Sequence, residues 1–227
     1  METQTDRKGE LMIELNQIYN QDCLEGMKEI PDGSIDMILC DLPYGITACA
    51  WDKVIPFEPL WEHYKRVIKS NGAIVLTASQ PFTTDLINSN RKWFKQELIW
   101  EKDIATGILY ANRRIMKIHE NILIFGKSAT AYNPQYEKGE PYKTTSKGCS
   151  KSFSRDDKVL IGGKVTISNG TRYPKSVLKI NTDRALHPTQ KPVAVFGDFI
   201  SVNCDSFPNE MLDRLTADYE TVEVDHD

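Results

Sequence analysis

Residues 36–52 read DMILCDLPYGITACAWD, and this stretch decides the fold that we expect. An apolar run at residues 37–40 ends in the acid Asp41, which Leu42, Pro43 and Tyr44 follow. A short apolar run between a Pro-Asp-Gly turn and a Leu-Pro step is typical of a buried strand. The sequence therefore predicts a strand whose last residue is a carboxylate, followed by a fixed turn and an aromatic ring.

The segments after this stretch alternate between strand and helix patterns. FEPLWEHYKRVIKSNG has apolar residues at helical spacing and predicts an amphipathic helix that ends at Asn71-Gly72. The following segments predict, in order, the strand AIVLTAS, the helix PFTTDLINSN and the strands QELIWEK and ENILIFGK. Such alternation favours an α/β fold of parallel βαβ units in an open, doubly wound sheet. Ligands bind such sheets beyond the carboxyl ends of the strands, where we expect Asp41.

The composition excludes several classes of protein. The 227 residues are 40% hydrophobic and 26% charged, an ordinary globular mixture. No apolar run approaches the roughly 20 residues of a membrane span, and the polar start lacks a secretory signal. The 5 cysteines form no CxxC pair, which argues against a disulfide framework and a zinc site. We therefore expect no bound metal and a cytoplasmic location.

Charge is distributed unevenly along the chain. Residues 127–184 contain twelve basic and five acidic residues, whereas residues 205–227 contain one basic and eight acidic residues. The basic segment is also rich in Gly, Ser and Thr with weak alternation, which predicts an irregular, partly β insertion outside the sheet. A basic segment in an acidic protein favours a module that faces phosphates. The alternative is a lysine-rich loop that is merely solvated.

The residues after the first strand suit a planar amino group. Asp41 can accept one N–H and a neighbouring main-chain carbonyl can accept the other, which makes the nitrogen a better nucleophile. Tyr44 offers a face on which the ring bearing that amino group can stack. The pattern indicates a pocket for an extruded nucleobase or another amide-like group. An ordinary turn after a strand remains the alternative.

Several blocks resemble one family in both order and spacing. CDLPYG is similar to the Asp-Pro-Pro-Tyr motif of amino-group DNA methyltransferases that use S-adenosylmethionine. The blocks IYNQDCLEGMKEIPDGSIDMILC, NGAIVLTASQPF, LIWEK, RIMKIHENILIFGK and ALHPTQKP also resemble that family, in its permuted β arrangement. The resemblance covers roughly residues 11–195. Leu42 replaces the first proline of the motif, but it still presents a carbonyl.

The resemblance implies a fold, a reaction and a set of partners. The fold is a Rossmann-like α/β methyltransferase sheet with an inserted DNA-recognition region. The reaction is methyl transfer from S-adenosylmethionine to an amino group of double-stranded DNA, and the Asp-led motif favours adenine N6. Asp41 and the Leu42 carbonyl would hold the amine, Pro43 would set the turn, and Tyr44 would stack on the base. Cytosine N4 and a glutamine amide in protein remain alternatives.

The resemblance also assigns residues to the cofactor and to the edge of the pocket. The cofactor residues that it implies are Asp22 near the adenine and His187, Thr189, Gln190 and Lys191 near the methionine end. For HPTQKP the alternative is a structural His-Pro turn. His119-Glu120 is expected at the rim of the base pocket, although an acid/base pair is the alternative. Trp51-Asp52 is interpreted as core and cap, with a place beside the base pocket as the alternative.

The resemblance divides the chain into four parts and fails in the last. Residues 11–127 form the catalytic half, 128–184 the target-recognition insert, 185–200 the start of the cofactor half and 201–227 a divergent acidic tail. The family's Gly-rich cofactor loop is not found after Gly197, so we expect an incomplete sheet. The explanations, in order, are a truncated gene, a homodimer or complementing chain that supplies the missing half, and an unusual cofactor site. A non-catalytic DNA-binding remnant is a further hypothesis.

Overall fold

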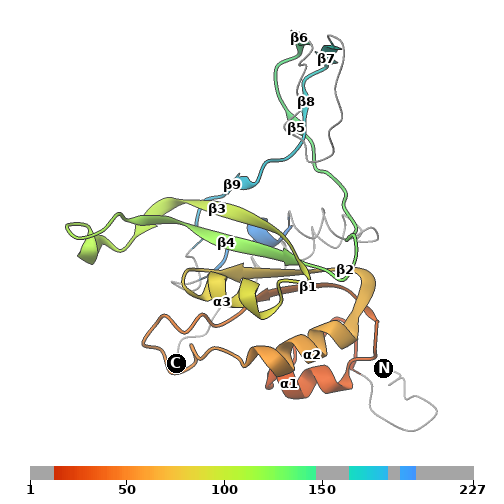
Figure 1. The fold of residues 1–227 in the computed structure, drawn as a ribbon. Coiled ribbons are helices and arrows are strands. Elements are labelled where there is room, and N and C mark those ends of the chain that lie inside the picture. The colour runs from red at the N-terminus through yellow and green to blue at the C-terminus, as the bar shows by residue number, and fades with distance from the viewer. Residues whose placement is uncertain (1–12, 147–163, 184–189, 198–227) are drawn as a thin grey trace. The chain divides into compact units, whose positions relative to one another are not determined.

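The computed structural model describes residues 13–146, 164–183 and 190–197. The chain divides into two compact units (Figure 1). The first, here the main unit, contains residues up to 133 and from 176 onward, and the second, here the inserted unit, is residues 134–175. Each unit is described by itself.

A five-stranded sheet forms the centre of the main unit. In spatial order its strands are β1 (Ile35–Asp41), β2 (Ile68–Ala78), β4 (Lys117–Phe125), β3 (Phe94–Thr106) and β9 (Val177–Lys179). The β1–β2 and β3–β9 pairs are parallel, whereas β2–β4 and β3–β4 are antiparallel. The α/β class is thus confirmed, but parallel pairing throughout was a wrong expectation. The segment between β3 and β4 is too short for a crossover helix, so these strands form a hairpin.

Short helices and 3₁₀ turns accompany the sheet. They include α1 (Cys23–Gly26), α2 (Phe57–Val67), α3 (Phe82–Ser89), η1 (Met27–Glu29) and η2 (Ile108–Tyr110), and residues 193–197 are also helical. The apolar stripe of α2, with Leu60, Trp61, Tyr64 and Val67 buried, packs on the same face of the sheet as Phe82 and Leu86 of α3. No helix among the described residues has the length and apolar character of a membrane span.

The end of α2 differs from the sequence expectation. The helix ends at Val67, and Ile68 already has extended backbone angles and belongs to β2. Gly72, which the sequence suggested as a helix stop, lies within β2. A Cβ added there would lie 2.7 Å from the carbonyl oxygen of Asp36 on β1. This glycine therefore permits two strands to approach closely.

The central strand β2 is buried on both faces. Ile74, Leu76 and Ala78 belong to the core beneath α2 and α3, whereas Val75 belongs to a second core on the opposite face. That second core also contains Trp100 of β3 and Val195. Burial on both faces explains why the sequence of β2 is a continuous apolar run without polar alternation.

The described residues of the inserted unit form two short antiparallel pairs. Strand β5 (Glu137–Lys138) pairs with β8 (Thr171–Arg172), and β6 (Tyr142–Ser146) pairs with β7 (Lys164–Ser168). The rings of Tyr136 and Tyr173 lie 5.1 Å apart, and the Arg172 guanidinium lies 4.6 Å from the Tyr142 ring centre. A partly β insertion was expected here. However, the sequence placed all of residues 128–184 outside the sheet, and this was wrong for β9, which pairs with β3 in the main sheet.

Candidate active site

The site begins where β1 ends. Asp41 is the last residue of β1 and lies opposite Thr77 in the parallel ladder with β2. The Thr77 hydroxyl donates a hydrogen bond to Asp41 Oδ1. Because both residues are at the carboxyl ends of parallel strands, they lie at the edge where ligands bind in such sheets. The carboxylate of Asp41 is 39% exposed, so it faces an open space.

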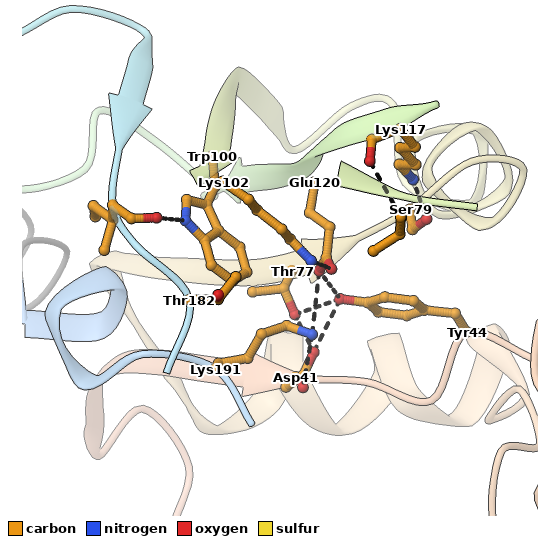
Figure 2. Close-up of polar contacts among 12 residues, drawn as sticks. Asp41, Tyr44, Thr77, Ser79, Trp100, Lys102, Lys117, Glu120, Thr182 and Lys191 are labelled. Atoms are coloured by element: carbon orange, nitrogen blue, oxygen red, sulfur yellow. Dashed lines mark hydrogen bonds and ion pairs between the residues drawn. The ribbon is translucent and has the colours of Figure 1, made fainter. Parts of the chain in front are cut away.

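Tyr44 connects Asp41 to a second carboxylate (Figure 2). Its hydroxyl oxygen lies 3.0 Å from Asp41 Oδ1 and 3.4 Å from Glu120 Oε2. It also lies 2.9 Å from the Thr77 hydroxyl. Burial, together with the charges of Asp41 and Glu120, raises the pKa of this phenol. Tyr44 is therefore neutral and can donate its proton to a carboxylate.

The Tyr44 ring packs against the core. It stacks on Phe82 of α3, with 5.4 Å between ring centres and an angle of 25° between planes. The Lys191 ammonium lies 5.3 Å from the Tyr44 ring centre. A base stacking on Tyr44 therefore has to share the ring with this lysine.

Glu120 on β4 is held by two lysines. Lys102 of β3 contacts Oε1, and Lys191 Nζ lies 3.1 Å from Oε2. All three side chains are at most 14% exposed. Burial of Glu120 opposes ionisation, but the charge of Lys191 and the hydrogen bond and charge of Lys102 outweigh it and lower the pKa of the carboxyl. Glu120 is therefore an ionised part of the wall at neutral pH.

Lys191 joins the two carboxylates. Its Nζ lies 3.3 Å from Asp41 Oδ2 as well as 3.1 Å from Glu120 Oε2. Figure 2 shows the ammonium between these two side chains and below Lys102. The Asp41 carboxylate thus has a nitrogen-bearing partner, Lys191, on its Oδ2 side.

These groups line a cavity of about 260 Å³. This is roughly the liquid volume of nine water molecules, enough for a small planar molecule. Residues from four separated segments line it: Asp41, Leu42, Pro43, Tyr44, Ile46, Thr47, Trp51 and Asp52; Trp100, Lys102 and Thr106; Glu120; and Thr182, Gln190 and Lys191. All four predicted catalytic residues thus lie around one cavity.

Asp52 fixes the loop after the catalytic motif. Its carboxylate accepts hydrogen bonds from the backbone N–H groups of Gly45, Ile46 and Thr47 at 2.7–2.9 Å. Burial opposes ionisation, but hydrogen bonds from the Thr47 side chain and these amides lower the pKa of Asp52 to about 2. Gly45 has a φ of 67°, which favours glycine. Asp52 is thus a cap that also lines the cavity.

The predicted cofactor residues are distributed differently. Gln190 and Lys191 line the cavity, whereas His187 and Thr189 lie outside the described residues. Asp22 is not part of the cavity lining. It is the N-cap of α1 and accepts a hydrogen bond from the Leu24 N–H at 2.8 Å. A cofactor role for these five residues stays a prediction.

Three important residues were given no role by the sequence alone. Thr77 ends a strand parallel to β1, so the rule that sites form at carboxyl ends could have found it. Lys102 and Trp100 lie in the block LIWEK, which carries the family resemblance but was given no role in a site. They face Glu120 only because β3 and β4 pair in one register, with Trp100 opposite Glu120. Trp100 is further fixed by a 2.8 Å hydrogen bond from its indole nitrogen to the Ile180 carbonyl (Figure 2).

The fold and the site define an α/β protein with a carboxylate-lined cavity at the carboxyl edge of a Rossmann-like sheet. The family model described as DNA methylase, for N6 and N4 methyltransferases, matches residues 35–218. The chain therefore belongs to this DNA methylase family.

Curated relatives are moderately similar. The type II methyltransferase M.BglII of Bacillus subtilis is 26% identical over 204 residues, which is 78% of this chain but only 53% of that protein. The type II methyltransferase M1.MboII of Moraxella bovis is 23% identical, over 88% of this chain and 83% of that protein. The DNA adenine methyltransferase YhdJ of Escherichia coli strain K12 is 26% identical, over 92% and 74%. The chain thus spans about half of the length of the first of these proteins.

Solved structures share the fold. The M1.HpyAVI–SAM complex matches with a TM-score of 0.50 at 20% identity, over 82% of this chain and 76% of that one. The cytosine-N4-specific PvuII DNA methyltransferase matches with a TM-score of 0.52 at 12% identity, over 82% and 70%. These likenesses support the Rossmann-like α/β architecture of the main unit.

Proposed function

We propose that this protein transfers a methyl group from S-adenosylmethionine to adenine N6 in double-stranded DNA. The observation that carries the proposal is the position of Lys191 Nζ, a hydrogen-bond donor held 3.3 Å from Asp41 at the end of β1. The Asp41 carboxylate that contacts this ammonium can also accept a hydrogen bond from an amino group. Membership of the DNA methylase family supports the reaction class.

In this proposal the chain's own residues position the amine. Asp41 and the Leu42 carbonyl accept its two hydrogens, which directs the nitrogen lone pair away from the ring. Tyr44, neutral and fixed by its hydrogen bonds, keeps Asp41 in place and presents its ring to the base. As the N–C bond forms, the bond between the methyl carbon and the sulfonium sulfur would break, and Asp41 would accept the N–H proton that the amine loses. Positioning supplies most of the rate enhancement.

The cofactor fits the chemistry of the site. The Asp41 carboxylate is open to the cavity and suits a cationic group, and Gln190 adds a hydrogen-bonding amide to the wall. When bound, S-adenosylmethionine would supply an electrophilic methyl group. The residues proposed to hold it are Asp22, His187, Thr189, Gln190 and Lys191. The solved structure of M1.HpyAVI, which has a similar fold, is named as a complex with this cofactor.

The insert at residues 128–184 is proposed to contact the DNA backbone through its basic side chains. Action on DNA would place the protein in the cytoplasm.

A second copy or another chain that completes the cofactor half is also part of this proposal. Light scattering with and without DNA tests whether such an assembly forms.

Substitution of Asp41 tests the reaction. We expect Asp41→Ala to lower methyl transfer by at least about 100-fold, because one of the two acceptors for the amine is lost. The matched control is Asp36→Ala, an acid on the same strand that pairs with Lys69 outside the cavity. Activity of Asp41→Ala within a few-fold of the parent would contradict the assignment.

Two further measurements separate the alternatives. Mass spectrometry of nucleosides from treated DNA distinguishes N6-methyladenine from N4-methylcytosine, and the second product would replace adenine by cytosine as the target. Calorimetric titration with S-adenosylmethionine tests the cofactor site directly. DNA binding without cofactor binding or turnover would show a non-catalytic member of the family.

A further inference from the structure

The hairpin between β3 and β4 exposes an unusual set of side chains. Residues 107–116, here the hairpin tip, follow the last paired residues, Thr106 and Lys117. Ile108, Leu109 and Ile115 are 71%, 91% and 96% exposed. Figure 1 shows this hairpin extending beyond the body of the sheet. Large apolar side chains that are gathered and exposed in this way mark a surface that contacts a partner.

The hairpin tip has a defined local structure. Residues 108–110 form the 3₁₀ turn η2, and Gly107 before it has a φ of 91°. The Tyr110 carbonyl accepts hydrogen bonds from the N–H groups of Arg113 and Arg114 at 2.8 and 3.0 Å. The Arg114 guanidinium also lies 4.6 Å from the Tyr110 ring centre. The apolar side chains are therefore presented by a folded turn.

The charge of the hairpin tip indicates the class of partner. Arg113 and Arg114 are exposed, and residues 107–116 contain no acid. The acid that precedes them, Asp103, accepts hydrogen bonds from the N–H and hydroxyl of Thr182 at 2.7 and 2.9 Å. Two arginines beside apolar side chains fit a polyanion that also offers apolar surface, which is the chemistry of a DNA duplex.

The position of the hairpin tip connects it to the active site. Thr106, the residue directly before it, lines the cavity that contains Asp41. A base that enters this cavity leaves a gap in its duplex, and an apolar side chain can fill or open such a gap. The hairpin tip begins one residue after this lining residue, so the chain leads directly from the cavity wall to the exposed apolar side chains.

We propose that the hairpin tip enters the DNA beside the extruded nucleotide, with Leu109 as an apolar wedge and Arg113 and Arg114 on flanking phosphates. This inference rests on the proposed function for its DNA substrate. It adds a positioning role for residues that no motif marks. A second copy of the chain on the same surface is the competing occupant.

The first experiment measures binding to a duplex of random sequence and needs no turnover. We expect Arg113→Gln/Arg114→Gln to weaken binding roughly ten-fold near 0.1 M salt and to reduce the slope of log affinity against log salt by about 2. The matched control is Arg91→Gln/Lys92→Gln, an exposed basic pair in the turn before β3. Equal slopes for both variants and the parent would overturn the phosphate contacts.

The second experiment tests the wedge on the site that the parent methylates, located by sequencing DNA from its expression host. With 2-aminopurine at the target, we expect Leu109→Gln to lower the fluorescence increase, and on the same duplex with adenine at the target we expect it to lower the rate of transfer roughly ten-fold. Leu15→Gln, at a leucine that is 87% exposed elsewhere, is the control. Placing the target base opposite an abasic site weakens its stacking, so it should restore the Leu109→Gln rate. A merely structural defect would not be rescued.

The outcomes separate this inference from the proposed function. A parent that flips and methylates DNA, with Leu109→Gln equal to Leu15→Gln, would overturn the wedge alone. A parent that does not bind DNA would overturn both. A change in oligomeric state on Leu109→Gln, seen by light scattering without any change in DNA binding, would assign the hairpin tip to a second copy instead.

Discussion

At the scale of single residues, the site is a balance of two carboxylates and two ammonium groups. Asp41 and Glu120 would repel each other across the cavity without Lys191 and Lys102. The sequence motif predicted Asp41 and its turn because those residues are adjacent in the chain. It could not predict the role of Lys102, because that pairing depends on the register of two strands that are distant from the motif.

The Lys191 ammonium sets the ionisation of Glu120. We expect Lys191→Met to raise the pKa of Glu120. The charge of Lys191 is the largest of the influences that lower this pKa against the effect of burial, and the variant removes that charge. Stability from ionised Glu120 is present above its ordinary pKa and is lost as pH falls through the lowered value. In the variant this loss therefore begins at a higher pH. Carbon-13 NMR titration of the glutamate carboxyls measures the shift, with Lys69→Met as the control. An unchanged Glu120 pKa would contradict the pairing.

Asp52 has a structural task that can be measured separately from catalysis. We expect Asp52→Ala to lower the free energy of unfolding by about 1–3 kcal/mol, because three backbone N–H groups lose a charged acceptor. Since the folded pKa of Asp52 is about 2 against an ordinary 3.8, its stabilisation is complete above that ordinary value and is lost as pH falls toward 2. Urea unfolding at neutral and acidic pH measures both effects. A variant with parental pH dependence would argue against the cap.

At the scale of elements, most strands and helices could be predicted, but their directions and ends could not. The strands beginning at residues 94 and 117 were expected from their apolar runs. Their antiparallel pairing follows from the short connection between them, which the alternating pattern obscured. The end of α2 was misplaced because Asn71-Gly72 has the composition of a helix stop. Glycine at position 72 is explained by the close contact between β1 and β2, which leaves no room for a Cβ atom beside the Asp36 carbonyl.

This close contact gives a test of the β1–β2 pair. We expect Gly72→Ala to cost about 1–3 kcal/mol in the free energy of unfolding, because its Cβ would meet the Asp36 carbonyl and the Ile68 side chain. Ser70→Ala, at an exposed position of the same strand, is the control and should change stability by less than about 0.5 kcal/mol. Chemical denaturation compares the two. Equal stability of both variants would mean that the strands separate at this point.

At the scale of the whole molecule, the basic segment of the sequence and the inserted unit of the structure cover similar residues. The basic segment at residues 127–184 predicted an insert, and the inserted unit occupies residues 134–175. Composition could not reveal that β9 returns to the main sheet, because three residues of weak alternation carry no signal of their partner. The family resemblance, which the DNA methylase model confirms over residues 35–218, could be recognised because its motifs are local blocks.

The basic side chains of the inserted unit lead to a prediction about salt. We expect Lys138→Gln/Lys143→Gln/Lys175→Gln to reduce the slope of log DNA affinity against log salt by about 2–3, because each phosphate contact releases counterions. The control carries Lys53→Gln, Lys92→Gln and Lys95→Gln, at exposed lysines of the main unit. Fluorescence anisotropy over a series of salt concentrations measures both slopes. If the first variant has the same slope as the parent, these lysines do not contact DNA phosphates.

The two anchors of the inserted unit have an evolutionary consequence. Before the unit, the Ala131 N–H and the Ser128 hydroxyl donate hydrogen bonds to the carbonyls of Asn71 and Ser70 on β2. After it, the Ser176 carbonyl accepts from Ile99, and β9 joins β3. Since the chain leaves and rejoins the sheet at fixed points, and added loop length costs little, residues 134–175 can diverge, lengthen or be exchanged between lineages. Selection on the residues around the Asp41 cavity then acts largely independently of the selection that shapes this appended part.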